Sequence, residues 1–380
     1  MEGLEELAHV STIRPEQLSR EKKRGAKIIG YTGRFVPEEL IYACGAIPYL
    51  IYRGGEPEPP EAVLPYSLRY ISPFARAQIG HHLLHMDPVV PMLDLIVAQC
   101  VDCHTARLAD LFEYFELPTT KIGVPSDWDK KISAEYYHRE LSRLKEKLEG
   151  ITGREISDEK LKESIEAINV IRSLLAKISH LRRKHPPPIG GYEFIRLNHY
   201  SFSCDPEDLA KGLNDICEDL QQRQSPFADS APRILLAGHV VGVGDYVVPK
   251  LIEDSGGVIV AEFLDEGMRQ YLRNVDTRGD LMTNLVRTYY RDRTPPSVFQ
   301  PAWSNRLAYM KKAVKDFRVD GVIWYQLSFE EIYNMEAAIV SKAMQEAGIP
   351  FLKLESSYEY AREAMGPLTT RIESFTRSIK

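Results

Sequence analysis

Short apolar runs recur along the chain and have the character of buried strands. Most of them are unbroken rather than alternating, and amphipathic helical segments separate them. An unbroken apolar run is typical of a strand that is covered on both faces, as in a parallel sheet. The runs form two groups, one before about residue 125 and one after about residue 230. They cover residues 47–51, 95–98, 233–237, 258–261, 321–325 and 351–354.

A helical stretch lies between the two groups. Leucines at 141–148 fall on one helix face, and a second apolar stripe with helical spacing covers 161–178. Ser157 is an N-cap candidate for the second helix, and the prolines at 186–188 end that helix. The pattern therefore predicts an α/β protein with two Rossmann- or flavodoxin-like parallel-sheet domains joined by a helical module. The predicted boundaries are 1–125, 126–200 and 201–380.

Composition narrows the class of protein. The 380 residues carry a net charge of −6, which gives no electrostatic reason to expect nucleic acid or an anionic membrane as a partner. No apolar run reaches the length of about 18 residues that a membrane span needs. The acidic N-terminus lacks the apolar stretch of a signal peptide. Five cysteines, an odd number, favour reduced thiols in a cytoplasmic protein.

Two cysteines with the spacing CxxC, Cys100 and Cys103, follow the apolar run at 95–98. They are compatible with a redox pair at a helix start, or with ligands to an iron–sulfur cluster. A zinc site would need more ligands, which His81 and His85 offer at helical spacing. The pair can also be two thiols without a chemical role. The residues alone leave these alternatives open.

A glycine-rich segment, Gly238-His239-Val240-Val241-Gly242-Val243-Gly244-Asp245, follows a predicted strand and precedes a helix-like segment. Glycines at such a junction allow the backbone to approach a ligand and present amide donors. The spacing fits the dinucleotide fingerprint poorly, and no nicotinamide signature follows it. A histidine in such a turn more often has a structural role than that of a base.

Two segments at opposite ends of the chain carry a resemblance to a known family. The first, at 30–48, reads GYTGRFVPEELIYACGAIP. The second, at 320–375, contains DGVIW, GIPFLKLESSY and GPLTTRIESF. In this order and at this separation they resemble subunits of 2-hydroxyacyl-CoA dehydratases and benzoyl-CoA reductases. The middle of the chain matches as well, so the resemblance covers nearly the whole sequence.

The resemblance implies three cysteine ligands for a [4Fe–4S] cluster, which leave the fourth iron open. The middle ligand matches Cys103, but Ser72 stands at the first position. The region of the third ligand contains no cysteine, and Ser328 is the nearest isostere. A hydroxyl replaces a thiolate poorly, because iron–sulfur clusters favour soft anionic donors. Cys100 offers one substitute. We therefore expect the cluster in a partner subunit rather than on this chain.

The resemblance also implies an acyl pocket near 30–39, with a hydroxyl and a carboxylate that hold and deprotonate the substrate. Thr32 and Glu56 match these roles. The alternative is that Pro37-Glu38-Glu39 begins a helix and that Glu56 is simply solvated. In the second domain the resemblance assigns the acyl-CoA face to Gly238, His239, Gly242 and Gly244.

The function that the resemblance implies is that of one subunit of a radical enzyme acting on an acyl-CoA thioester. An ATP-dependent iron–sulfur activator supplies a low-potential electron, and a paralogous, cluster-bearing subunit is the partner. The reaction is the dehydration of a 2-hydroxyacyl group or the reduction of an aromatic ring. The alternative from another class is a cluster-free structural or CoA-binding subunit without chemistry of its own.

Overall fold

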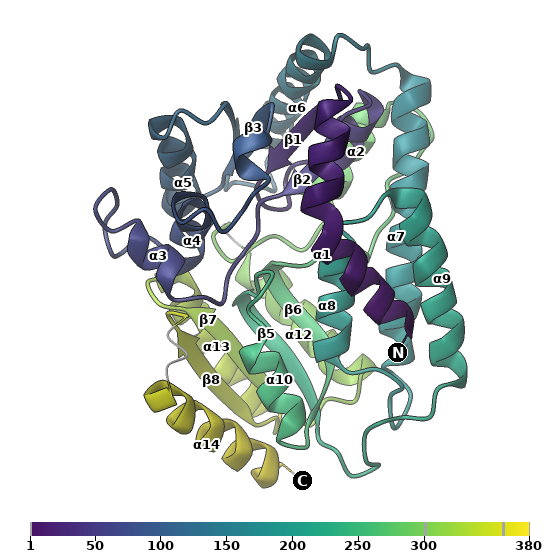
Figure 1. Ribbon diagram of the computed structural model, residues 1–380. Coiled ribbons are helices and arrows are strands. Elements are labelled where there is room, and N and C mark those ends of the chain that lie inside the picture. Colours follow the sequence, from purple (N-terminus) through teal and green to yellow (C-terminus); the bar gives the residue numbers. More distant parts are fainter. Residues whose placement is uncertain (1, 300–301, 359–361, 380) are drawn as a thin grey trace.

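The computed structural model describes residues 2–299, 302–358 and 362–379, which form two parallel sheets with helices around them (Figure 1). The first sheet contains β1 (Ile28–Tyr31), β2 (Ile47–Leu50), β3 (Leu95–Cys100) and β4 (Thr119–Gly123) in the order β2-β1-β3-β4. Each neighbouring pair is parallel.

The second sheet is also parallel throughout. It contains β5 (Arg233–Val240), β6 (Val258–Glu266), β7 (Gly321–Leu327) and β8 (Phe351–Ser356) in the order β6-β5-β7-β8. β5 and β7 are buried along their whole length, as the unbroken apolar runs predict. The predicted fold class, an α/β protein with two parallel-sheet domains, is confirmed.

Two strands, β1 and β4, were not predicted from the apolar runs. β1 is only four residues long and contains Gly30, which weakens the apolar signal. A side chain there would meet the Leu93 side chain, because its Cβ would lie 2.5 Å from Leu93 Cδ1. β4 lies at the edge of the sheet and reads Thr-Thr-Lys-Ile-Gly. An edge strand is less covered than a central one, so its sequence can be polar and gives no apolar run.

The helices confirm the predicted helical stretch and extend it. Ser157 caps its helix, since its Oγ accepts a hydrogen bond from the amide of Lys160 at 3.3 Å. Helices α1 and α9 lie outside 126–200, yet they pack against α7 and α8 of that stretch. The domain boundaries therefore stay a prediction. The helices in chain order are α1 (Glu2–Lys23), α2 (Glu38–Ala43), α3 (Glu58–Ala62), α4 (Pro73–Leu83), η1 (Val90–Met92), α5 (Cys103–Tyr114), α6 (Lys131–Thr152), α7 (Asp158–Leu181), α8 (Gly191–Tyr200), α9 (Pro206–Gln222), α10 (Val247–Asp254), α11 (Leu281–Val286), the π-helix η2 (Arg287–Arg291), α12 (Trp303–Asp316), α13 (Glu331–Glu346) and α14 (Arg362–Ser378).

The two sheets lie one above the other, and α7 and α9 run along one side of both (Figure 1). A short backbone contact joins the domains where β2 and β5 end. The amide of Val243 donates to Tyr52 O at 2.8 Å, and the amide of Gly54 donates to Val243 O at 3.0 Å. In the described part of the chain, no helix combines the length and the apolar character needed to cross a bilayer.

Candidate functional site

The carboxyl ends of the two sheets face a small cavity of about 50 Å³ between the domains. The first domain contributes Thr32 after β1, Gln99 of β3 and His104 of α5, and the second contributes His239 of β5 and Glu330 before α13. Residues that follow parallel strands gather at one sheet edge, which is where ligands of such folds bind. This cavity is therefore the candidate site.

A wider opening of about 440 Å³ adjoins the cavity on the side of His104 and Glu330. Cys103, at the first position of α5, and Tyr70 line this opening. The cavity and the opening therefore share part of their walls, and the opening lies next to the exposed cysteine.

Glu330 is the most unusual ionisable group of the site. Its side chain is buried, with Oε1 3.4 Å from His239 Nδ1 and Oε2 3.9 Å from His104 Nε2. Burial raises the pKa of Glu330 well above its ordinary value, although the Ser72 hydroxyl opposes the shift. Burial also lowers the pKa of His239 to about 4. Burial therefore favours the uncharged form of both groups, a carboxylic acid beside a neutral imidazole, and such a pair is suited to holding or passing a proton.

Ser72 and Cys103 lie at the starts of two neighbouring helices. Ser72 is buried before α4, and its amide donates to His104 Nδ1 at 3.2 Å. Partial desolvation and the charge of Asp102 raise the pKa of the Cys103 thiol. Burial likewise raises the pKa of Cys100, which ends β3. Both cysteines are therefore thiols at neutral pH rather than reactive thiolates.

Ser328 does not face this group. Its hydroxyl donates to Glu355 Oε1 at 3.1 Å and accepts a hydrogen bond from Ser357 Oγ at 2.9 Å, at the ends of β7 and β8. Phe329 has a left-handed φ of 69°, which turns the chain between Ser328 and Glu330. Glu330, not Ser328, therefore reaches toward Ser72 and His104.

These residues do not fit a [4Fe–4S] cluster. Such a cluster is normally held by thiolates, whereas this place offers the hydroxyl of Ser72, the thiol of Cys103 and the carboxyl of Glu330. Within the described ranges, no three His, Cys, Asp or Glu side chains are arranged to hold a metal ion.

The two predicted substrate residues do not line the same space. Thr32 lines the cavity, and its Oγ1 accepts a hydrogen bond from the backbone amide of Gln99 at 3.1 Å. Glu56 is not part of the cavity lining; its Oε2 lies 2.5 Å from Nε2 of the buried His81. The hydrogen bond from His81 lowers the pKa of Glu56, so Glu56 is ionised at neutral pH.

The carboxylate on the Thr32 side of the cavity is Glu266, at the end of β6. Gln99 connects the two, because its Nε2 donates to Glu266 Oε1 at 3.0 Å. Desolvation raises the pKa of Glu266, and the charge of Arg34 opposes that shift. The catalytic roles of Thr32 and Glu56 stay predictions.

The predicted glycine segment divides between packing and the cavity. Gly238, with φ of 135°, has no room for a side chain, because its Cβ would lie 1.9 Å from Tyr325 O in β7. Gly242 and Gly244 pack against Gly54 of the other domain. His239 lines the cavity, with its ring 4.3 Å from that of Tyr333. These glycines thus serve backbone packing, and their proposed part in acyl-CoA binding stays a prediction.

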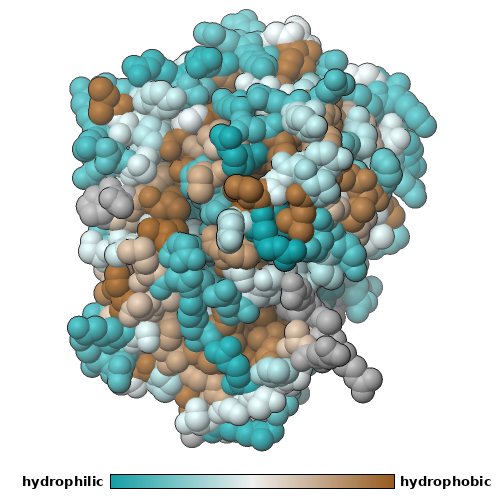
Figure 2. All heavy atoms as spheres, turned by 90° about the vertical axis from the view of Figure 1, so that its left-hand side faces the viewer, coloured by the Kyte–Doolittle hydropathy of each residue, from teal (hydrophilic) through white to brown (hydrophobic). Residues whose placement is uncertain are grey.

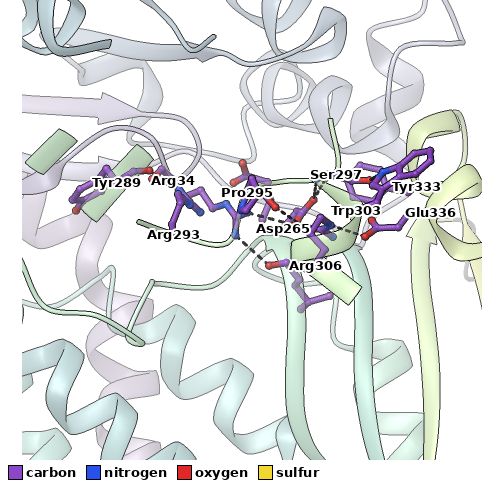
Figure 3. A network of polar contacts seen from close by, with 12 residues as sticks. Arg34, Asp265, Tyr289, Arg293, Pro295, Ser297, Trp303, Arg306, Tyr333 and Glu336 are labelled. Carbon is purple, nitrogen blue, oxygen red and sulfur yellow. Dashed lines mark hydrogen bonds and ion pairs between the residues drawn. The ribbon is translucent and has the colours of Figure 1, made fainter. Parts of the chain in front are cut away.

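A buried ionic network supports the cavity from the second domain (Figure 3). Asp265 of β6 accepts hydrogen bonds from the Tyr333 hydroxyl at 2.7 Å and the Ser297 amide at 2.8 Å, and it pairs with Arg306. Arg306 also donates to Glu336 Oε1 at 2.6 Å. The network fixes the segment before α12 and the position of Tyr333 at the cavity wall.

Sequence reasoning missed Glu330, Gln99 and Glu266. Each follows or ends a strand that the apolar pattern predicts, and polar residues at such places were the available signal. Which of them point into the cavity depends on side-chain direction, which a strand pattern does not reveal.

Comparisons with known proteins show which family the chain belongs to. The family model described as "2-hydroxyglutaryl-CoA dehydratase, D-component" matches residues 34–379. The putative dehydratase subunit YjiM of Escherichia coli (strain K12) is 26% identical, over 93% of this chain and 92% of that protein. One of the benzoyl-CoA reductase subunits of Thauera aromatica is 26% identical, over 95% and 93%. The beta subunit of (R)-2-hydroxyglutaryl-CoA dehydratase from Acidaminococcus fermentans is 23% identical, over 99% and 98%.

The family match covers most of the chain and includes both sheets except β1. The resemblance stated from the sequence is therefore confirmed: this chain belongs to the 2-hydroxyglutaryl-CoA dehydratase D-component family.

Proposed function

We propose that this chain is the cluster-free subunit of a two-subunit enzyme that acts on an acyl-CoA thioester. The observation that carries the proposal is the group at the domain junction, where Ser72, Cys103 and Glu330 offer a hydroxyl, a thiol and a carboxyl rather than three thiolates. This chain has two parallel-sheet domains with a cavity between them, and in its described part no set of thiolate donors is gathered there. The relatives named as subunits of a dehydratase and of a reductase support membership in such a complex.

The proposed partner is a paralogous subunit that bears the [4Fe–4S] cluster. Exposed apolar side chains gather on the face that Figure 2 shows. We call the aromatic face the surface formed by Tyr66, Leu68, Tyr70, Tyr114 and Phe329, whose aromatic rings make contacts in two groups. Tyr70 and Phe329 also line the 440 Å³ opening. A partner on this face would cover apolar surface and close the opening beside Glu330.

The proposed reaction is the dehydration of a 2-hydroxyacyl-CoA, driven by an electron from an ATP-dependent iron–sulfur activator in an oxygen-sensitive complex. The reduction of benzoyl-CoA, after which the Thauera relative is named, is the second candidate. This chain would bind and orient the thioester and exclude water, with Thr32 and Glu330 among the polar groups that line the cavity.

The test is anaerobic co-expression with a paralogous subunit, followed by iron and sulfide counts on each separated chain. We expect the iron on the partner alone, and turnover of a 2-hydroxyacyl-CoA by the complex with activator and ATP. Cys103→Ala should leave iron content and turnover unchanged. About four irons on this chain, lost in Cys103→Ala, would refute the cluster-free assignment. Turnover of benzoyl-CoA instead would select ring reduction, and a complex inactive on both would favour a structural subunit.

A further inference from the structure

A second cleft, of about 360 Å³, lies beside β6, the strand at the edge of the second sheet. Its walls come from the end of α7, from residues 268–273 and from α12. Arg34 and Arg293 lie at its inner part, among the residues that Figure 3 labels. We call it the basic cleft, because seven Arg and Lys side chains line it against four carboxylates, in a chain whose net charge is −6.

Most of these charges are already paired within the protein. Arg306 is paired with Asp265, and Arg269 with Glu38. The outer Lys312 and Arg183 share Asp316. Two arginines of the cleft have no such carboxylate partner among the residues that the structure describes.

Arg273 and Arg293 form no ion pair with any residue that the structure describes. Arg273 is exposed at the mouth of the cleft, and Arg293 is 7% exposed at its inner part. The cleft therefore has one arginine at its mouth and one at its inner part that are available to bind an anion.

The buried Arg293 lacks acceptors for part of its guanidinium group. Its Nη1 donates to the carbonyl oxygens of Arg34 and Tyr289, both at 3.2 Å, whereas its Nε and Nη2 have no hydrogen-bond partner in the described part of the chain. The guanidinium also lies over the Phe35 ring, 4.5 Å from the ring centroid. Burial and the neighbouring charge of Arg34 lower the pKa of Arg293 to about 9. A buried guanidinium without an anion is costly, and a phosphate oxygen is the acceptor that its planar fork suits best.

Aromatic rings line the same cleft. Phe263 of β6 and Tyr309 of α12 stack with centroids 4.8 Å apart, and Tyr271 and Phe317 lie in the same wall. Arginines without a carboxylate partner suit phosphate groups, and aromatic rings beside them suit the flat apolar face of a base. The two together suit a nucleotide. We propose that the basic cleft binds the phosphate groups of a nucleotide, with Arg293 and Arg273 as phosphate ligands.

The position of the cleft indicates which nucleotide. It shares Arg34 with a smaller pocket, and that pocket shares Gly33 and Glu266 with the cavity between the domains. A ligand with its nucleotide in the cleft can thus extend toward Thr32. On the proposed function, the nucleotide is that of coenzyme A.

The test is calorimetric titration of the full chain, alone and in its complex, with coenzyme A, 3′-dephospho-coenzyme A, ADP, pantetheine and inorganic phosphate. We expect the phosphorylated nucleotides to bind and pantetheine to bind far more weakly. Arg293→Gln should weaken coenzyme A binding about tenfold or more, the effect of one charged hydrogen bond or two. Arg273→Gln, at an exposed position that does not threaten folding, should weaken it as well. Arg278→Gln, on the surface outside the cleft, is the matched control.

Nucleotide binding that neither Arg293→Gln nor Arg273→Gln weakens overturns the inference. Phosphate that binds as tightly as ADP also overturns it, because the cleft would then be a small-anion site. Loss of nucleotide binding in both variants supports it, whatever the complex turns over. If ADP binds in the cleft while the complex turns over no acyl-CoA, the nucleotide site stands and the proposed function fails.

Discussion

Arg306 provides a sharp test of how the second domain supports the candidate site. Its side chain is 0% exposed and donates to Asp265, Glu336 and the carbonyl oxygen of Pro295. Burial raises the pKa of Asp265, but the charges of Arg306 and Arg34 outweigh burial and hold that pKa below its ordinary value. Arg306→Met keeps the aliphatic volume and removes the charge, so two buried carboxyls lose their main counter-ion.

The expected loss is about 3 to 5 kcal/mol of unfolding free energy, the usual effect of removing one partner of a buried ion pair. The unfolding entropy for 380 residues is roughly 0.8 kcal/mol/K, so the melting temperature should fall by about 4 to 6 °C if the chain unfolds as one unit. Lys312→Met is the matched control on the same helix. Its side chain is 70% exposed and pairs with Asp316, which limits the expected change to about 1 kcal/mol.

Urea unfolding monitored by circular dichroism, together with a thermal melt, measures both variants. Adding Glu336→Gln to Arg306→Met should recover part of the loss, because one stranded carboxylate is removed. Equal stability of Arg306→Met and Lys312→Met would show that the network contributes no more than a surface pair. The reasoning about buried charge would then be wrong.

Three further measurements test other parts of the structure. Burial lowers the pKa of His199 to about 4 from an ordinary 6.5, so the unfolded state binds the extra proton first and stability falls as the pH drops. Between pH 7 and 5 this costs about 2 kcal/mol, a slope that should shrink in His199→Gln; an unchanged slope contradicts the assignment. Gly238→Ala should lose about 3 kcal/mol or more to backbone strain and overlap with β7, whereas Gly150→Ala, in open space on α6, should gain about 0.5 to 1 kcal/mol in the same unfolding assay. Tyr70→Ser should weaken assembly with the partner in sedimentation velocity, whereas Ile132→Ser, equally exposed at the start of α6, should not; equal effects would argue against the aromatic face as the interface.

The sheets were predictable because their central strands are buried on both faces. β5 and β7 each contain an unbroken apolar run, at 234–237 and 322–325, and a short run of this kind between turn residues is typical of a strand covered on both faces. β1 and β4 were not predictable in this way. Gly30 makes room for Leu93 in β1, and the polar edge strand β4 gains its place from pairing with β3.

The site was only partly predictable, because its residues come together from distant parts of the chain. Thr32, His239 and Cys103 lie at or just after strand ends and were named from the sequence. Glu330 was not named, because the left-handed turn at Phe329 decides which neighbour faces inward, and no pattern in the sequence marks that turn. Arg293 lies after a π-helix on a segment without periodic signal, so its burial beside Arg34 appears only in three dimensions.

The sizes of the two adjoining spaces bear on where the proposed chemistry would take place. The cavity at Thr32, of about 50 Å³, holds little more than a narrow part of a ligand, whereas the opening beside Glu330 and Cys103 measures about 440 Å³. On the proposed function, the thin arm of a thioester would pass the narrow cavity and its acyl group would occupy the wide opening. That opening lies against the aromatic face, so the reacting carbon would meet the partner subunit there. An acyl group held in this way needs no cluster on this chain, because the redox centre can approach from the other side of the interface.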